Sequence, residues 1–309
     1  MRSLLSVFTI GLFQTTLRTA TPVVLAALGI LMTDHVGIMN IGMDGMMLCG
    51  AFFAVMGNVF LGGWPGGLLL ALAVGLLLGI FFGVFVVKFK SDEYIIGVAL
   101  NIFAGGLTVL LLRTIFGVTG SFQGTAERPI APLPTIDIPL IRDIPVLGSL
   151  LSGNTLLVYV SWILTAAAYV LIYRTPFGFW LRAAGEHPES LRAAGRSPEK
   201  MKYIASILCG LFSGLAGAHL SLGYLTKFTE GMSASRGFIA VACVIFGGSN
   251  PPRVFLAALL FGFIDALGMR IQDFHVDSNL TTLAPYLVTV IMMVAVVLRA
   301  RRRKRRMAG

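Results

Sequence analysis

Several polar side chains stand inside long apolar runs, where they could bind a small polar ligand or bond one helix to another. Asn40 and Asp44 lie in the stretch Gly37–Gly45, and Asn101 lies in a separate run. A side-chain amide both donates and accepts hydrogen bonds, so Asn40 and Asn101 suit either role. A carboxylate in apolar surroundings is costly, so Asp44 requires a wet or hydrogen-bonded position.

Asp265 and His219 also lie within apolar runs. For Asp265, one turn before Met269, an ion pair or hydrogen bond between helices is favoured over ligand contact. His219 is expected to be a hydrogen-bonded core group. Ser213 lies six residues before His219, roughly 600° around a helix, which argues against a serine nucleophile with a histidine base. Because the four histidines are scattered and no phosphate-binding loop occurs, we predict no catalytic residue, no metal and no cofactor.

A further group of residues lies in the polar loop 174–200. Pro188 suits the first position of a helix, Glu189 is favoured by the helix dipole, and Gly195 suits the position after the helix ends. The pattern predicts a helix of about two turns over 188–194, too short to be stable alone in water. It must therefore rest on a surface, and we predict a docking element for a partner. Its candidate residues are Gly185, Glu186, Pro188, Glu189, Arg192 and Gly195.

The chain that positions these residues is too apolar to fold as a soluble globule. Of 309 residues, 56% are hydrophobic and 12% are charged, which excludes a soluble enzyme. The net charge of +10 does not indicate a nucleic-acid binder, because most of the chain is too apolar to be exposed. We predict a single transmembrane domain over 1–309, an all-α polytopic membrane protein in contact with lipid. About nine segments are expected, near 4–32, 38–60, 66–88, 94–116, 154–173, 201–225, 238–248, 252–271 and 281–299.

Two of these segments do not suit a simple crossing. The second begins with glycines, an amide and a carboxylate, and the seventh, 238–248, is too short. Broken backbone at membrane depth is tolerated only where it is buried in protein or lines a wet cavity. We therefore expect the broken stretch Asn40–Met47 to line a pathway, although a glycine-rich helix packed against a neighbour remains an alternative. The candidate pathway residues are Asn40, Met43, Asp44, Met46, Met47 and Asn101.

Basic residues predict the orientation of the chain. They are concentrated in the loop 174–200 and in the tail 299–309, so both are expected in the cytoplasm. Lys88, Lys90 and Arg253 fall on the same side when crossings are counted. The proline-rich loop 117–153 is then extracytoplasmic and is expected to hold extended pieces.

The two halves of the chain contain similar blocks. Segments two and three flank Gly62-Gly63, and segments seven and eight flank Gly247-Gly248. The predicted orientation places these turns on opposite faces of the membrane. This is the pattern of an inverted repeat, and transporters often hold their solute at the interface of such repeats.

These motifs resemble a known family. The pattern Gly-x3-Arg-Ala-x-Gly-x2-Pro-x3-Arg-Ala-Ala-Gly at 178–195 is similar to the coupling helix of permease subunits of ABC importers in the ribose and branched-chain amino acid group. Thr21–Gly29 and Gly37–Met47 resemble more narrowly its nucleoside and simple-sugar branch. The resemblance extends from about residue 20 to 270 and includes Ile96–Asn101, Gly231–Gly248 and Phe261–Leu267. His187 departs from a common Asn, and Asp44 from a common Glu.

The resemblance implies a bundle of the vitamin B12 permease type in the cytoplasmic (inner) membrane. It also implies an ATPase subunit that hydrolyses ATP beneath the membrane, a solute-binding lipoprotein, and usually a second, longer permease. A nucleoside or purine is favoured over a simple sugar as the solute. The alternative from the residues alone is an ion-coupled secondary transporter or channel, which needs no ATPase and no capped cytoplasmic helix.

Overall fold

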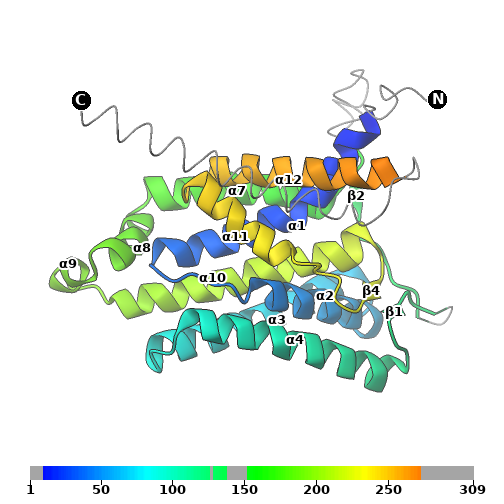
Figure 1. Ribbon diagram of the computed structural model, residues 1–309, viewed down its shortest axis with the longest axis horizontal. Coiled ribbons are helices and arrows are strands. Elements are labelled where there is room, and N and C mark those ends of the chain that lie inside the picture. Colours follow the sequence, from blue (N-terminus) through cyan, green and yellow to red (C-terminus); the bar gives the residue numbers. More distant parts are fainter. Residues whose placement is uncertain (1–9, 126–127, 138–151, 273–309) are drawn as a thin grey trace.

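The computed structural model describes residues 10–125, 128–137 and 152–272, which form a bundle of roughly aligned helices (Figure 1). Seven described helices are long and apolar enough to cross a membrane, so the predicted all-α polytopic architecture is confirmed. They are α1 (Ile10–His35), α2 (Met43–Phe60), α3 (Trp64–Gly83), α4 (Glu93–Phe116), α7 (Leu156–Arg174), α10 (Pro198–Ala218) and α12 (Pro251–Gln272). Single π-helical stretches, η2 (Val84–Lys88) and η3 (His219–Tyr224), extend α3 and α10.

The short helices lie between these spans. They are α8 (Pro176–Glu186), α9 (Pro188–Ala193) and α11 (Arg236–Gly247). The seventh predicted segment corresponds to α11, which is shorter than a membrane crossing requires. The ninth predicted segment, 281–299, and the tail 299–309 lie outside the described residues.

The described parts of the loop 117–153 are extended, as its prolines predict. Two strands of this loop pair with strands outside it. β1 (Ser121–Phe122) pairs antiparallel with β4 (Phe228–Thr229), and β2 (Thr135–Ile136) pairs antiparallel with β3 (Asn154–Thr155). The Asn58 amide holds this loop on the bundle, since it donates to the Ala131 carbonyl at 2.8 Å and accepts from the Ala131 N–H at 2.9 Å. The described parts of the loop therefore lie at the end of the bundle opposite α9 (Figure 1).

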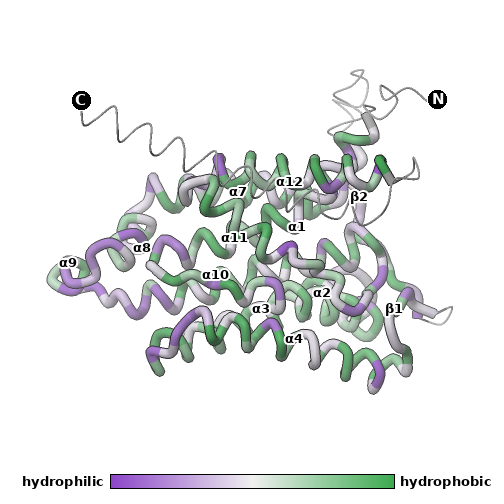
Figure 2. Tube along the Cα trace, in the orientation of Figure 1, coloured by the Kyte–Doolittle hydropathy of each residue, from purple (hydrophilic) through white to green (hydrophobic). Residues whose placement is uncertain are grey.

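The helices differ in how deeply they are buried. α1, α2 and α10 form the interior, whereas α3, α4, α7 and α12 lie outside and expose apolar side chains such as Ile102, Ile163 and Leu256. Hydrophobic residues dominate the middle of the bundle, and hydrophilic residues gather at its ends, around α8 and α9 on one side (Figure 2). This distribution is the one expected of a bundle surrounded by lipid.

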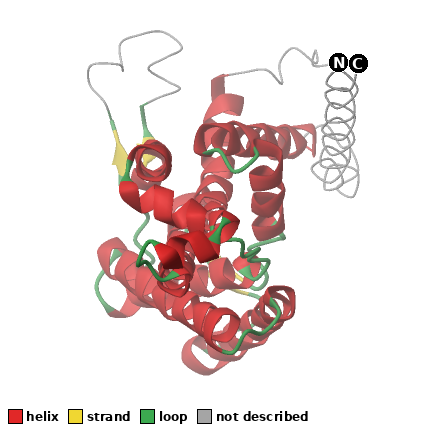
Figure 3. Cartoon of the chain, turned by 90° about the vertical axis from the view of Figure 1, so that its left-hand side faces the viewer, coloured by secondary structure: helices red, strands yellow, loops and turns green. Residues whose placement is uncertain are grey.

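The two halves of the chain pack in corresponding ways. α10 packs along α3 and α2, and α1 packs along α12 and α11, while α1 and α10 contact each other. α3 and α12 run in opposite directions: the end of α3 lies beside the start of α10, and the start of α12 lies beside the end of α1. These exchanged contacts are what an inverted repeat predicts. Figure 3 views the bundle along its length and shows the helices packed against one another, with the short strands at the margin of the bundle.

Candidate solute pathway and coupling element

The predicted interruption of the second segment is present. α1 ends at His35, residues 36–42 are not helical, and α2 begins at Met43. Two amides bind the freed backbone: the Asn40 Oδ1 accepts from the Gly42 N–H at 2.9 Å, and the Asn101 Oδ1 accepts from the Gly45 N–H at 2.7 Å. The Asn101 Nδ2 also donates to the Ile41 carbonyl at 3.0 Å. Polar backbone at this depth is thus satisfied by protein, as an apolar surrounding requires.

The position of the break corrects one expectation. The sequence predicts a broken stretch from Asn40 to Met47, but Met43 to Met47 are helical. The amide of Asn101, supplied by α4, satisfies an N–H of the first turn of α2, so the helix is able to begin several residues earlier than expected.

Asp44 joins the starts of two helices. Its Oδ1 accepts from the Gly237 N–H at 3.0 Å, and its Oδ2 accepts from the Ser233 hydroxyl at 2.8 Å. Gly237 is in the first turn of α11, where the helix dipole stabilises a carboxylate. A Cβ on Gly237 would lie 2.4 Å from the Asp44 nitrogen, so only glycine permits this approach. The helices α2 and α11 therefore meet at their N-terminal ends.

The chain reaches α11 through strained backbone. Ala234 and Ser235 both have positive φ, at 46° and 61°, in the left-handed region that non-glycine residues rarely adopt. Such conformations persist only where surrounding structure holds them and are concentrated at functional sites. Here the Ser233 hydroxyl and the Gly237 N–H, on both sides of the strained pair, are held by Asp44.

The six predicted pathway residues lie in one region but differ in exposure. Asp44 in the first turn of α2 and Asn101 in the middle of α4 are half-buried. The Asn40 amide is fully buried and donates to the Cys209 sulfur at 3.3 Å. Of the six, four are completely enclosed among the helices: Asn40, Met43, Met46 and Met47.

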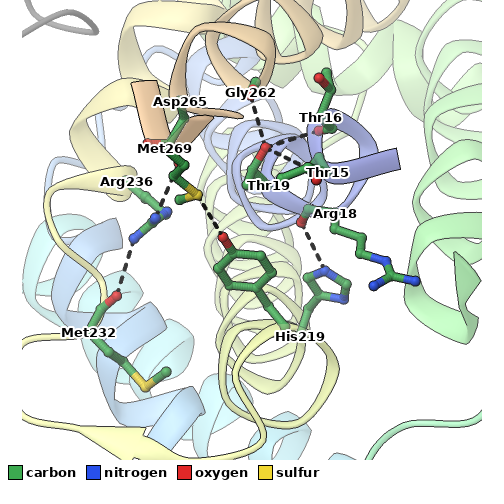
Figure 4. A network of polar contacts seen from close by, with 11 residues as sticks. Thr15, Thr16, Arg18, Thr19, His219, Met232, Arg236, Gly262, Asp265 and Met269 are labelled. Carbon is green, nitrogen blue, oxygen red and sulfur yellow. Dashed lines mark hydrogen bonds and ion pairs between the residues drawn. The ribbon is translucent and has the colours of Figure 1, made fainter. Parts of the chain in front are cut away.

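A second polar network lies between α1, η3, α11 and α12 (Figure 4). The Arg236 guanidinium is 3.3 Å from the Asp265 carboxylate, which is the interhelical ion pair expected for Asp265. The Tyr224 hydroxyl donates to the Met269 sulfur at 3.1 Å. Arg236 was not singled out from the sequence, although a cation directly before Gly237 in an apolar run is a usable signal. The pair fixes the start of α11 to α12.

His219 is a buried, hydrogen-bonded core group, as expected. Its Nε2 lies 3.2 Å from the Arg18 carbonyl, and its side chain is not exposed (Figure 4). The Ser213 hydroxyl donates to the Gly210 carbonyl of its own helix at 2.7 Å. Among the described residues, no group of His, Cys, Asp and Glu is arranged to hold a metal.

The helix predicted over 188–194 is present as α9 (Pro188–Ala193), and its docking role stays a prediction. Pro188 is at its first turn, Leu191 is buried beneath it, and Gly195 follows with φ of 75°. The Arg192 guanidinium is 2.6 Å from Glu189 and is also paired with Glu199 on α10, which raises the pKa of Arg192. The side chains of Glu186, Glu189 and Arg192 are exposed to solvent.

The surface on which α9 rests was only partly foreseen. It includes α8, a helix that the sequence analysis did not delimit, although Thr175-Pro176 is a usual helix start. The Thr175 hydroxyl accepts from the Gly178 N–H at 3.2 Å, and the Arg196 guanidinium lies 4.1 Å from the centre of the Trp180 ring. A cation over an indole ring is a favourable contact, so α8 and the residues after α9 form one unit.

Gly185 connects this unit to the non-helical segment 36–42. A Cβ at Gly185 would lie 2.5 Å from the His35 carbonyl oxygen and 2.9 Å from the Val36 carbonyl carbon. The backbone of α8 therefore rests directly on the chain where α1 ends and residues 36–42 begin. Nearby, the Ser249 hydroxyl donates to the Asp34 carboxylate, so the turn between α11 and α12 joins the same end of α1.

A spanning bundle in which two interrupted segments meet at their helix starts is typical of membrane transport proteins. The family described as branched-chain amino acid transport system, permease component, matches residues 12–297. The chain belongs to this family and is a permease component.

Similar proteins include the guanosine ABC transporter permease protein NupQ of Bacillus subtilis, 33% identical over 92% of this chain and 91% of its own length. The putative glucose ABC transporter permease protein TsgC13 of Haloferax volcanii is 34% identical over 86% and 79%. The nucleoside ABC transporter permease protein NupC of Lactococcus lactis is 28% identical over 89% and 88%. No solved structure gives a significant match.

Proposed function

We propose that this permease imports nucleosides as one half of an ABC importer and that a separate subunit hydrolyses the ATP. Two of the similar proteins named above are permeases for guanosine or nucleosides, which supports this choice of solute. The single structural observation that carries the coupling is the contact of Gly185 with the chain at His35 and Val36. Through it, a force on α8 and α9 reaches the interrupted segment directly.

The route of that force follows named contacts. Movement of α8 displaces residues 35–37, and the non-helical stretch 36–42 leads to the start of α2. Asp44 then passes the displacement to α11 through its bonds to Ser233 and Gly237. The helices are rigid and the connection between them is short, so a shift at α9 changes the junction between the two halves of the chain.

The pathway that we propose borders this junction. Asp44 and Asn101 are half-buried there and offer a carboxylate and an amide, which suit sugar hydroxyls and the edge of a base. Asn40, Met43, Met46 and Met47 contact the solute only when α2 shifts, because they are enclosed in the present conformation. Pliable methionine walls then allow a flat base to pass without being held tightly.

The orientation and partners are part of the same proposal. The end of the bundle with α8 and α9 also contains Lys88, Lys90 and Arg253, so basic residues support a cytoplasmic position for this end and for the tail 299–309. The ATPase subunit docks on α9 there, in the inner membrane of the cell. A second permease forms the other half of the pathway, and a solute-binding lipoprotein delivers the nucleoside at the end covered by the loop 117–153.

A sugar is the second candidate solute, because the relative that is 34% identical is named as a glucose permease. An ion-coupled transporter or channel would need neither the ATPase nor the docking helix. Uptake by the assembled importer in vesicles separates these possibilities. We expect labelled guanosine uptake that depends on ATP and on the binding protein, and that glucose does not inhibit.

The coupling is tested with Gly185→Ala in the same vesicles. The added methyl group cannot fit against His35 and Val36, so the variant is expected to hydrolyse ATP without guanosine uptake. Gly106→Ala on α4 is the matched control, because nothing lies within 4 Å of a Cβ there, and its uptake is expected to be unchanged. Normal uptake by Gly185→Ala would refute the coupling route, whereas loss of uptake in both variants would show a general intolerance.

A further inference from the structure

An apolar groove runs along the outer surface between α1, α7 and α12. Its volume is about 680 Å³, and its lining includes Leu17, Trp162, Tyr169, Phe255 and Leu256. A second hollow of about 360 Å³ continues it along α1 and α12, past Phe13 and Phe263. The lining side chains face outward, since Leu256 is 63% exposed and Val170 is 50% exposed. This groove is separate from the junction of α2 and α11.

One end of the groove is basic. The Tyr173 hydroxyl lies 3.4 Å from the Ser249 carbonyl, which places the end of α7 beside the turn that precedes α12. Arg174 follows Tyr173, and Arg253 lies on the first turn of α12 next to the lining residue Pro252. Both arginines are exposed, and neither forms an ion pair within the described part of the chain.

We infer that this groove binds an anionic phospholipid, with its phosphate at Arg174 and Arg253 and its acyl chains along α7 and α12. The proposal rests on charge complementarity: an apolar channel parallel to the spans ends at two cations that have no ion-pair partner among the described residues. A zwitterionic lipid also has a phosphate, but its own ammonium offsets that charge, so the arginines favour an anionic headgroup. Neither arginine belongs to the coupling contact or to the junction, so substituting them leaves those contacts in place.

The groove contains its own reporter. Trp162 lines it and lies 12 residues before Arg174 on α7, which is about 18 Å along the helix and near the centre of the bilayer. A permease that keeps only Trp162, made with Trp64→Phe and Trp180→Phe, is reconstituted with its partner subunits in nanodiscs. The signal of the same assembly with Trp162→Phe is subtracted, so that the tryptophans of the partner subunits do not contribute. The nanodiscs contain phosphatidylcholine and increasing amounts of lipid brominated on its acyl chains, either phosphatidylglycerol or phosphatidylcholine.

We expect brominated phosphatidylglycerol to quench Trp162 at about fivefold lower mole fraction than brominated phosphatidylcholine, given the attraction of each cation for anionic lipid. Arg174→Gln with Arg253→Gln should abolish the preference and leave quenching by phosphatidylcholine. Lys88→Gln with Lys90→Gln is the matched control, since these exposed cations lie at the same end of the bundle, at the end of η2 and in the loop after it, and the preference should remain.

Three outcomes would overturn the inference. Equal quenching by the two lipids in the unsubstituted groove would show that the arginines select no headgroup. Absence of quenching by either lipid would show that protein covers the groove, either residues 281–299 of this chain or the partner permease. A preference that survives loss of both arginines would also refute the assignment of the headgroup site.

Discussion

The starts of α2 and α11 occupy corresponding places in the fold but are stabilised differently. The start of α2 is held by the neutral amide of Asn101, and its approach, including Asn40, is enclosed in the core. The start of α11 is held by the carboxylate of Asp44, and its approach contains two residues in the left-handed region. Arg236 and Asp265 add an ion pair at α11 that has no counterpart among the described contacts of α2.

This difference indicates which side of the junction between α2 and α11 moves further. A neutral, enclosed cap is a packing device that favours one arrangement. A charged cap beside strained backbone holds a conformation that other arrangements could replace, because strain is released when the cap leaves. We therefore expect the approach to α11, residues 230–235, to move further than the start of α2 when the displacement passes through the junction.

The largest expected effect is that of Gly237→Ala. Its methyl group would lie 2.4 Å from the Asp44 nitrogen, so α2 and α11 must separate. We expect the free energy of unfolding to fall by about 3 kcal/mol, as in an overpacked core, and guanosine uptake to be lost. Thermal unfolding in detergent measures the first, with Gly106→Ala as the reference. An unchanged midpoint would mean that the close approach does not exist.

Asp44→Ala is next in size. It leaves the Gly237 N–H and the Ser233 hydroxyl without an acceptor, at a cost of about 2 kcal/mol. Asp44→Asn keeps an acceptor for Gly237 and should cost less, so the pair of variants separates the charge from the hydrogen bond. If both substitutions leave the unfolding midpoint unchanged, the carboxylate does not hold α11.

Asn101→Ala should have a smaller effect on transport than Asp44→Ala. It removes the partners of the Gly45 N–H and the Ile41 carbonyl, and we expect a loss of about 1 kcal/mol in stability. Because the start of α2 is expected to move less than the approach to α11, the variant importer should still take up guanosine, at a reduced rate. A greater loss of uptake with Asn101→Ala than with Asp44→Ala would reverse the comparison.

The smallest perturbation is a single cysteine used as a probe. In a background with Cys49, Cys209 and Cys243 replaced, Ala234→Cys should react with a small thiol reagent, since Ala234 is exposed. Met47→Cys should not react without ATP, because Met47 is enclosed. Reaction at position 47 only during ATP turnover, with protection by guanosine, would support the proposed pathway. Reaction at 47 in the resting protein would contradict the enclosed start of α2.

The amino-acid sequence by itself determined the class of structure. Apolar runs of crossing length predict the seven long spans, because a lipid environment demands apolar side chains along each helix. A break in the second segment was also predicted, since glycine, amide and carboxylate groups interrupt that run, and the short α11 was predicted because its apolar run is too short to cross. The helix α9 followed from Pro188 and Gly195, whose backbone preferences are local.

Only the tertiary structure decided the partners. Asp44 is bonded to Ser233 and Gly237, and Asn101 to Gly45 and Ile41, across separations that no local rule specifies. Asp265 was expected to be in an ion pair, but its partner Arg236 depends on how α11 meets α12. The burial of Met43, Met46 and Met47 likewise depends on which face of α2 meets α10 and α1, because the helix is apolar on every side.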